Sequence, residues 1–165
     1  MKHDNFLILG IDPGLGKTGY GLIELDGYER KIIEGGIVKT KVKEPIEKRL
    51  FAIYKGISEV INEYKPSVIV IEEIYVHKQY PRTAMIMGYV RGILLMVAGM
   101  NSIPVVGYSS TKIKKFLTGN GRASKQQVQR MVKEQLKIKK VSYSEDVSDA
   151  LAAALCHANF ISSNV

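Results

Sequence analysis

The pattern of hydrophobic and polar positions divides the chain into short apolar runs and longer segments with helical spacing. The apolar runs are rich in β-forming residues and are bounded by Gly, Pro or Asp, which is typical of strands. Asp26-Gly27 lies between the second and third runs and favours a hairpin. The predicted strands cover residues 6–12, 18–25, 30–40, 68–71 and 103–108.

Apolar residues three and four positions apart predict helices in most of the remaining chain. Ser124 begins one of them, and Gln127 three residues later completes a capping box. The segment 83–99 is apolar nearly all round, which indicates a buried helix or an interface. Residues 75–82 are predicted as a loop. The predicted helices cover residues 45–64, 83–99 and 111–117, with two more beginning at Ser124 and near 142–144.

The order of these elements predicts an α/β fold. Three strands joined by hairpin connections come first, and helices and strands then alternate. A parallel crossover is right-handed and places a helix over the sheet. The sequence therefore predicts a ribonuclease H-like three-layer sandwich, with a mixed five-stranded sheet flanked by helices. At 165 residues we expect a single domain covering residues 1–165.

Composition narrows the class of protein. With 45% hydrophobic and 24% charged residues, the chain is neither a disordered tail nor a fibre. Its one cysteine, Cys156, excludes a disulfide framework and a multi-cysteine zinc site. Cys156 and His157 lie late in an apolar helix, and we expect them to fill the core or the surface rather than to bind a ligand. No uninterrupted apolar run reaches the ~20 residues of a membrane span, so we expect a cytoplasmic protein with no membrane partner.

Charge is concentrated in one segment. The chain has a net charge of +8, and residues 112–140 contain ten basic residues and one acidic residue. Such a segment favours a polyanion such as nucleic acid, although a solvated helix face is the plain alternative. Lys125 is predicted to lie at a helix start, where it could stabilise a negative transition state. The cations expected to contact a phosphate backbone are Lys112, Lys114, Lys115, Arg122 and Lys125.

Acidic residues follow two of the predicted strands. Asp12 ends the first strand, and taken alone it is explained equally well as an ordinary turn aspartate. The neighbouring Gly16-Lys17-Thr18 is not a phosphate-binding loop, because Ile11 stands where that motif needs a glycine. Glu72 and Glu73 end the fourth strand. Because side chains alternate across a strand, only one of them can share a face with Asp12, and periodicity does not choose between them.

A third acidic pair begins the last helix. Asp146 and Asp149 are three residues apart, so they share a helix face near the positive end of the helix dipole. With Asp12 and one of the strand-end glutamates they would form a group of four carboxylates. Crowded carboxylates repel one another, and Mg²⁺ or Mn²⁺ relieves that repulsion. Two such ions would activate water against a phosphodiester.

Four motifs together resemble a known family. GIDPGLGKTGYG, VIVIEEIY, GYVRG and SEDVSDALAAALCHA cover nearly the whole chain in order, and they resemble the RuvC family of Holliday junction resolvases. The resemblance implies a homodimer that nicks two opposing strands of a four-way DNA junction in recombination and repair. It also implies Mg²⁺ as the cofactor, with two ions expected per site and Mn²⁺ able to substitute, and contact with the branch-migration proteins RuvA and RuvB.

The resemblance also assigns residues. The family's metal-binding acids fall on Asp12, Glu72, Asp146 and Asp149, which favours Glu72 over Glu73. The aromatic residue that enters the junction falls on Tyr75. The functional lysines of the family fall on Lys114 and Lys125.

Two other functions fit part of the sequence. A phosphotransferase of the actin and sugar-kinase type also opens with a strand, an aspartate and a glycine-rich hairpin, but it needs two such domains. A non-catalytic DNA-binding module explains the basic segment. It would leave four carboxylates repelling the phosphates that it binds.

Overall fold

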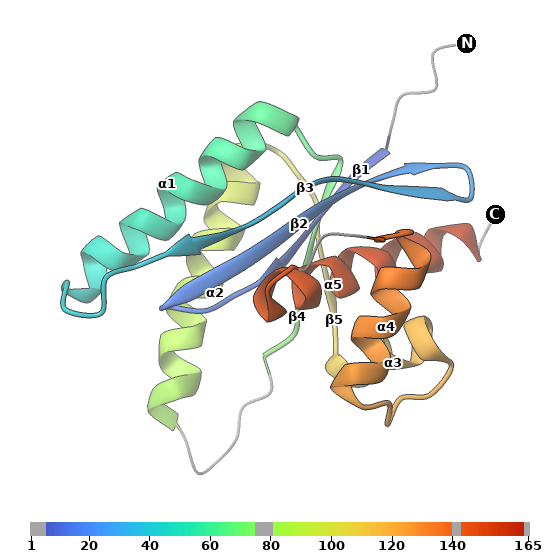
Figure 1. Cartoon of the computed structure of the whole chain (residues 1–165). Helices are drawn as coiled ribbons and strands as arrows, with labels where there is room; N and C mark the ends of the chain where they lie inside the picture. Colours follow the sequence, from blue (N-terminus) through green and yellow to red (C-terminus); the bar gives the residue numbers. More distant parts are fainter. Residues whose placement is uncertain (1–5, 75–80, 140–142, 164–165) are drawn as a thin grey trace.

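A mixed sheet forms the centre of the molecule. A computed structural model of the chain describes residues 6–74, 81–139 and 143–163. The sheet has the order β3-β2-β1-β4-β5 (Figure 1). β1, β2 and β3 pair antiparallel, whereas β4 pairs parallel with both β1 and β5. The strands are β1 (Phe6–Asp12), β2 (Lys17–Asp26), β3 (Glu29–Lys39), β4 (Val68–Glu72) and β5 (Val105–Tyr108).

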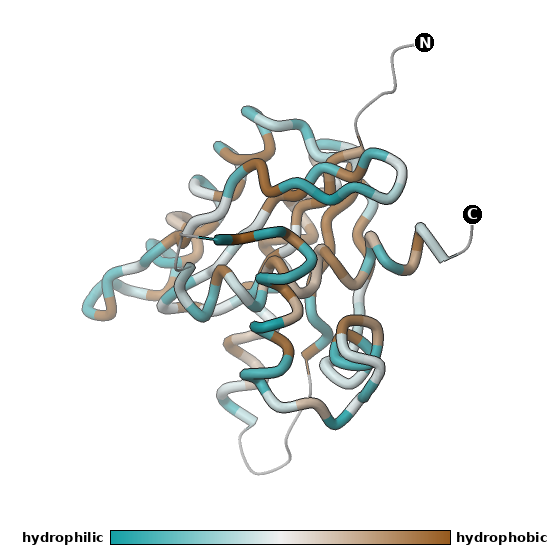
Figure 2. Tube along the Cα trace, turned by 45° about the vertical axis from the view of Figure 1, so that its right-hand side comes forward, coloured by the Kyte–Doolittle hydropathy of each residue, from teal (hydrophilic) through white to brown (hydrophobic). Residues whose placement is uncertain are grey.

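Helices cover both faces of the sheet, as the sequence predicts. On one face α1 (Ile46–Tyr64) and α2 (Pro81–Met100) pack over Leu9 and Ile11 of β1. On the other face lie α3 (Ser110–Thr118), α4 (Lys125–Gln135) and α5 (Glu145–Ser162), packed over Ile8. The alternation along β1 therefore divides the core into two layers. In Figure 2 hydrophobic stretches follow the strands and the helices packed on them, while the peripheral turns are mostly hydrophilic.

α5 approaches the sheet closely because both surfaces are built from small residues. A Cβ atom at Gly10 of β1 would collide with the backbone carbonyl oxygen of Ala150. The helix contributes ten buried residues, among them the run from Ala150 to Ala154. Close packing of this helix fixes its first two turns, which carry Asp146 and Asp149, against the carboxyl end of β1.

The predicted boundaries of two elements need correction. The loop predicted over residues 75–82 is wrong at its end, because α2 begins at Pro81; residues 75–80 lie outside the described part of the chain. Proline is well tolerated in the first turn of a helix. β5 begins at Val105 and not at residue 103, because Pro104 has no N–H for the ladder. Its carbonyl oxygen still accepts a 3.0 Å hydrogen bond from the Ile69 N–H.

α2 is apolar but mostly uncovered. It has the length and apolar composition of a membrane span, a test that helices packed inside or between proteins also pass. Its buried residues are Val90, Leu94, Val97 and Ala98. The exposed apolar residues on the same helix are Met85, Tyr89, Leu95, Met96 and Met100. The sequence predicted either a buried helix or an interface for this segment. The exposed apolar residues fit an interface better than a fully buried helix.

Candidate active site

Asp12 lies at the carboxyl end of β1 on the face covered by α5. Strand alternation places it there, because Gly10 and Ile8, two and four residues earlier, face the same helix. Asp12 pairs with Gly19 of β2. A Cβ atom at Gly19 would come within 2.9 Å of the Asp146 Cβ and would collide with its backbone oxygen. The missing side chain at Gly19 thus lets Asp146 settle beside Asp12.

The structure places Glu72, the last residue of β4, and Glu73, the residue after it, on opposite faces of the sheet. Val70 faces the α5 layer, so Glu72 faces it too, while Ile71 faces the α2 layer. Glu73 follows the strand and lies on the α2 side, where its Cγ is 3.1 Å from the position of a Cβ atom at Gly107. Arg91 approaches the same point from α2. Glu72 therefore shares its face with Asp12, and Glu73 does not.

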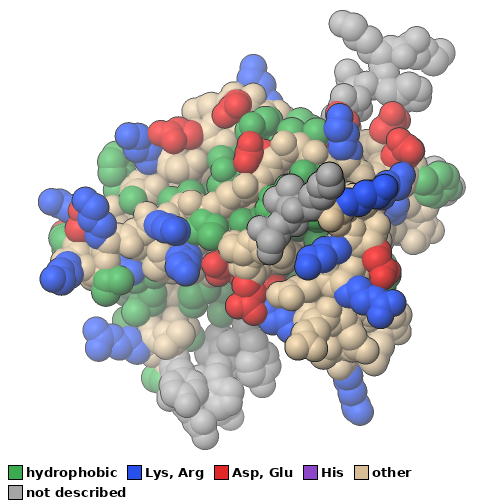
Figure 3. All heavy atoms as spheres, in the orientation of Figure 1, with side chains coloured by type: hydrophobic (Ala, Val, Ile, Leu, Met, Phe, Trp, Pro, Cys, Tyr) green, Lys and Arg blue, Asp and Glu red, His purple; other side chains and the backbone are tan. Residues whose placement is uncertain are grey.

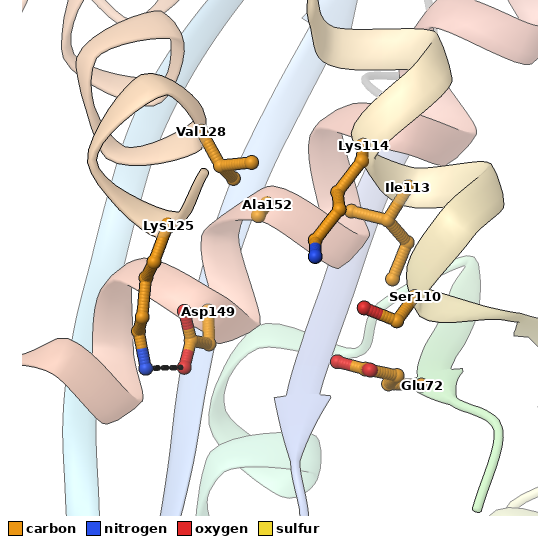
Figure 4. A pocket seen from close by; sticks show the side chains of 8 residues that line it. All are labelled: Glu72, Ser110, Ile113, Lys114, Lys125, Val128, Asp149 and Ala152. Carbon is orange, nitrogen blue, oxygen red and sulfur yellow. Dashed lines mark ion pairs between the residues drawn. The ribbon is translucent and has the colours of Figure 1, made fainter. Parts of the chain in front are cut away.

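A pocket joins Glu72 to Asp149 across the gap between β4 and α5. It has a volume of about 190 Å³. The Ser110 hydroxyl donates a hydrogen bond to the Glu72 carboxylate from the first residue of α3. Figure 4 shows the Lys114 ammonium pointing into the space between the two carboxylates. The lining residues are Glu72, Ser110, Ile113, Lys114, Lys125, Val128, Asp149 and Ala152.

Lys125 closes the pocket on the α4 side. It is the first residue of α4, whose start is fixed by the predicted capping box between Ser124 and Gln127. Its Nζ lies 3.1 Å from Asp149 Oδ2, the pair drawn dashed in Figure 4, and 2.6 Å from Glu145 Oε1. Partial burial acts to lower the pKa of Lys125, but the hydrogen bonds to Glu145 and Asp149 raise it on balance. The lysine therefore keeps its positive charge beside the acids.

The four acids Asp12, Glu72, Asp146 and Asp149, here called the acidic cluster, share one electrostatic environment. Burial raises the pKa of Asp12 to about 7, and the charges of Asp149, Glu72 and Asp146 add to that rise. Burial followed by the charge of Asp149 also raises the pKa of Glu72. The pKa of Asp149 is raised mainly by burial, against the lowering effect of Lys125. Such groups are costly as anions without a cation.

The acidic cluster has the donor chemistry of a site for a hard divalent cation, although its oxygens are not gathered at coordination distances. Within residues 6–74, 81–139 and 143–163, no group of three or more Asp, Glu, His or Cys side chains is placed to hold a metal ion. One carboxylate oxygen of Asp149 forms an ion pair with Lys125. Mg²⁺ and Mn²⁺ prefer carboxylate oxygens. The residues therefore fit such an ion by type and charge.

The other predicted DNA-contacting residues lie outside the pocket. The Lys112 Nζ stacks over the Tyr108 ring, 5.1 Å from its centroid, and over Phe160 at 5.9 Å. Lys115 and Arg122 are exposed on and after α3. Tyr75 falls outside the described residues. Figure 3 shows acidic side chains near the centre of this face, between two groups of Lys and Arg side chains.

Sequence reasoning missed Ser110 and Glu145 as parts of this site. Ser110 follows β5, and β5 pairs with β4 so that Tyr108 lies beside Glu72. That register brings the start of α3 to the acidic cluster, and only the strand order reveals it. Glu145 precedes Asp146 in the motif, and its place in the first helical turn was the available signal. His157 and Cys156, which the sequence analysis expects to fill the core or the surface, are both buried.

Comparison with known proteins identifies the family. The family described as crossover junction endodeoxyribonuclease RuvC matches residues 8–157. The chain belongs to the RuvC family. A RuvC from Desulforamulus reducens is 42% identical over 94% of this chain and 95% of its own. A RuvC from Syntrophotalea carbinolica is 44% identical over 92% and 93%.

Solved structures agree with this assignment. Thermus thermophilus RuvC is 30% identical, with a TM-score of 0.89 over 96% of this chain and 97% of its own. The same protein in complex with a Holliday junction substrate is 31% identical with a TM-score of 0.90, and 96% of each chain is covered. These matches confirm the resemblance and the ribonuclease H-like sandwich predicted from the sequence. Yeast mitochondrial Ydc2, at 13% identity and a TM-score of 0.64, shares the fold.

Proposed function

We propose that this chain is a metal-dependent endodeoxyribonuclease that resolves four-way DNA junctions, with the acidic cluster as its catalytic centre. The observation that carries the proposal is the convergence of four carboxylates from β1, β4 and α5, where burial and then the neighbouring negative charges raise the pKa of Asp12 to about 7. Membership of the RuvC family supports the reaction class. The complex of Thermus thermophilus RuvC with a Holliday junction supports the substrate.

The acidic cluster would hold the metal. Asp12, Glu72, Asp146 and Asp149 are the proposed ligands of Mg²⁺, with two ions expected and Mn²⁺ able to substitute. Bound there, the ions would supply an activated water and neutralise charge on the phosphate. The protein's own part is to fix the ligands on the ends of β1 and β4 and on the first two turns of α5. Ser110, at the start of α3, donates a hydrogen bond to the Glu72 carboxylate.

Two lysines, Lys125 and Lys114, would stabilise negative charge on the phosphate. Lys125 pairs with Asp149 and with Glu145. When Asp149 turns to a metal, Glu145 still holds the ammonium beside the pocket. Lys114 reaches into the same space from α3. Both ammonium groups would then stabilise the negative charge that develops on the scissile phosphate. Lys112, Lys115 and Arg122 would contact the backbone further away, and Tyr75 would enter the junction.

A second copy of the chain is the proposed partner of α2. The exposed apolar residues on this helix form a face of the kind that obligate partners cover. A homodimer would carry two active sites related by a twofold axis, which matches paired nicks in a four-way junction. Contact with RuvA and RuvB, a cytoplasmic location and a single domain over residues 1–165 complete the proposal.

One experiment tests the proposal. The protein is incubated with a labelled synthetic four-way junction and with a linear duplex of matching sequence, in Mg²⁺, Mn²⁺ or chelator. We expect paired symmetric nicks in the junction alone, and only with a divalent ion. Junction binding without nicks would instead indicate a DNA-binding module. ATP turnover without DNA would indicate a phosphotransferase of the kind that the first motif also allows.

A further inference from the structure

A second group of basic side chains lies away from the basic segment that the sequence singles out. It is formed by the start of β2, the end of β3, the loop that follows and the first turn of α1. All of its members are exposed except Arg49, which is partly buried. Glu44 and Glu47 are the acidic residues of the segment 39–49. This group, here called the basic tip, consists of Lys17, Lys39, Lys41, Lys43, Lys48 and Arg49.

The basic tip and the acidic cluster lie at the same edge of the sheet. Lys17 pairs with Lys39 across β2 and β3, and Asp12 pairs with Gly19 two residues further along β2. Adjacent strands are about 4.8 Å apart, so β3 runs roughly 10 Å from β1. Figure 3 shows Lys and Arg side chains gathered over the α1 and β3 end of this face, across the acidic patch from those of α3 and α4. The acids are therefore flanked by positive charge on two sides.

The basic tip is held firmly against the loop that follows Asp12. The Thr40 N–H donates a 3.0 Å hydrogen bond to the Gly16 carbonyl, and the Thr40 hydroxyl donates one of 2.5 Å to the Leu15 carbonyl. The Arg49 Nε in turn donates to the Thr40 hydroxyl oxygen at 3.0 Å. One polar network thus joins the first turn of α1, the end of β3 and the loop after β1. The lysines around it are presented on a fixed support.

We propose that the basic tip binds the phosphate backbone of a DNA duplex arm, on the side of the acidic cluster opposite to α3 and α4. The spacing fits, because the roughly 10 Å between β1 and β3 is close to the ~12 Å width of the DNA major groove. A duplex whose scissile phosphate lies at the acidic cluster would present its other strand to the tip. Few of the tip's charges are neutralised within the chain: the Lys41–Glu44 pair is 4.0 Å long and largely exposed. This inference rests on the proposed function.

The test measures the salt dependence of junction binding. The variant Lys41→Gln/Lys43→Gln is compared with Lys31→Gln/Lys55→Gln, which removes the same charge from exposed positions near the start of β3 and in the middle of α1, away from the basic tip. Affinity for a fluorescent four-way junction is measured from 50 to 300 mM NaCl in chelator, so that no cleavage interferes. Loss of two phosphate contacts should lower the slope of log K against log salt by about 2. The tip variant should also bind several-fold more weakly at 100 mM, with the control variant unchanged.

The outcomes separate this inference from the proposed function. An unchanged slope in the tip variant, while the wild-type chain binds and nicks the junction, overturns the role of the tip and leaves the nuclease standing. Equal losses in both variants also overturn it, because the effect would then come from net charge alone. A wild-type chain that neither prefers nor nicks the junction contradicts the proposed function itself. Cleavage in Mg²⁺ should remain normal in the control variant Lys31→Gln/Lys55→Gln, because its substitutions lie outside both the basic tip and the pocket.

Discussion

α5 and α2 are both apolar helices and lie on opposite faces of one sheet, but only α5 is covered within the chain. α5 buries ten residues in 18 and brings two carboxylates to the end of β1. α2 buries four residues in 20 and leaves a row of Met, Leu and Tyr side chains exposed. The difference lies in the surfaces that receive them. Gly10, Gly19 and Gly21 admit α5 to the sheet, and side chains at these positions would collide with it.

The comparison teaches that hydrophobicity alone does not say what covers a helix. The alanines of α5 pack against glycines in β1 and β2, so the apolar surface of α5 is buried within one chain. A Cβ atom added at Gly88, Gly92 or Gly99 of α2 would meet no atom of the described neighbouring elements within 4 Å. The apolar surface of α2 is therefore available to another molecule. Substitutions on α5 should damage folding or chemistry, and those on the open face of α2 should damage assembly.

The largest effect is expected at the start of α5. Asp149→Asn should reduce junction cleavage at least about 10³-fold, because several kcal/mol of metal-dependent stabilisation would be lost. Junction binding in chelator should persist, since one negative charge near the phosphates is removed. Single-turnover cleavage and fluorescence anisotropy measure the two quantities. Glu59→Gln, on the exposed side of α1, is the matched control and should cleave normally. Full cleavage by Asp149→Asn would remove this residue from the site.

The next effect tests the close approach of α5. Gly10→Ala should lower the free energy of unfolding by about 3 kcal/mol, because the new methyl group meets the backbone of α5 at Ala150. Gly99→Ala in the last turn of α2 meets no atom within 4 Å and should gain up to about 1 kcal/mol. Urea unfolding followed by circular dichroism compares them. Equal stability of the two variants would show that α5 can move away from the sheet at little cost.

The exposed face of α2 is tested by charge. Leu95→Glu should raise the dimer dissociation constant about 100-fold, or about 2.7 kcal/mol, because a twofold interface would bury the new carboxylate twice. The fold should remain intact, since Leu95 is 44% exposed in the single chain. Tyr28→Glu, at a residue 74% exposed on the β2–β3 turn, is the control. Sedimentation equilibrium measures the constant. A wild-type chain that stays monomeric at high concentration would contradict the proposed dimer.

A smaller effect follows from the repulsion within the acidic cluster. Asp12→Asn should raise the free energy of unfolding in chelator at neutral pH by about 1 kcal/mol, after allowance for its partial exposure to solvent. The cause is that Asp12 is disfavoured as an anion, with its pKa raised to about 7 by burial and by neighbouring acids. Asp26→Asn, an exposed residue at the end of β2, should change little. A less stable Asp12→Asn would mean that the carboxylate makes favourable contacts in the free protein.

The sequence predicted most elements because their signals are local. The alternation of β1, the capping box of α4 and the hairpin at Gly27, whose φ is 57°, each depend on neighbouring residues. The choice between Glu72 and Glu73 was not local. It depends on the parallel register of β4 with β1, which pairs Gly10 with Val70 and Ile11 with Ile71. Only the strand order, or the resemblance, resolves it.

The basic tip and Glu145 escaped prediction for a related reason. The tip's charge is divided among two strands, a loop and a helix, and Glu44 and Glu47 interrupt it along the chain. It becomes a surface only when β2 and β3 pair. Glu145 contacts a lysine twenty residues earlier in the chain, and that contact depends on how α4 docks on α5. A helix or strand can be predicted from its own residues, but a contact between two elements cannot be predicted from either segment alone.

The smallest expected effect is the pH dependence of the stability that His157, near the carboxyl end of α5, contributes. His157 is 8% exposed, and its Nδ1 lies 2.8 Å from the Tyr108 hydroxyl. Burial lowers the pKa of His157 below its usual 6.5, so the folded state favours the neutral ring. The stability that neutral His157 contributes is therefore complete above pH 6.5 and is lost as the pH falls toward its lower folded value. The stability difference between the wild-type chain and His157→Gln should accordingly narrow between pH 7.5 and about 5. Urea unfolding across this range measures it, and a difference that stays constant would show that folding does not change the pKa of His157.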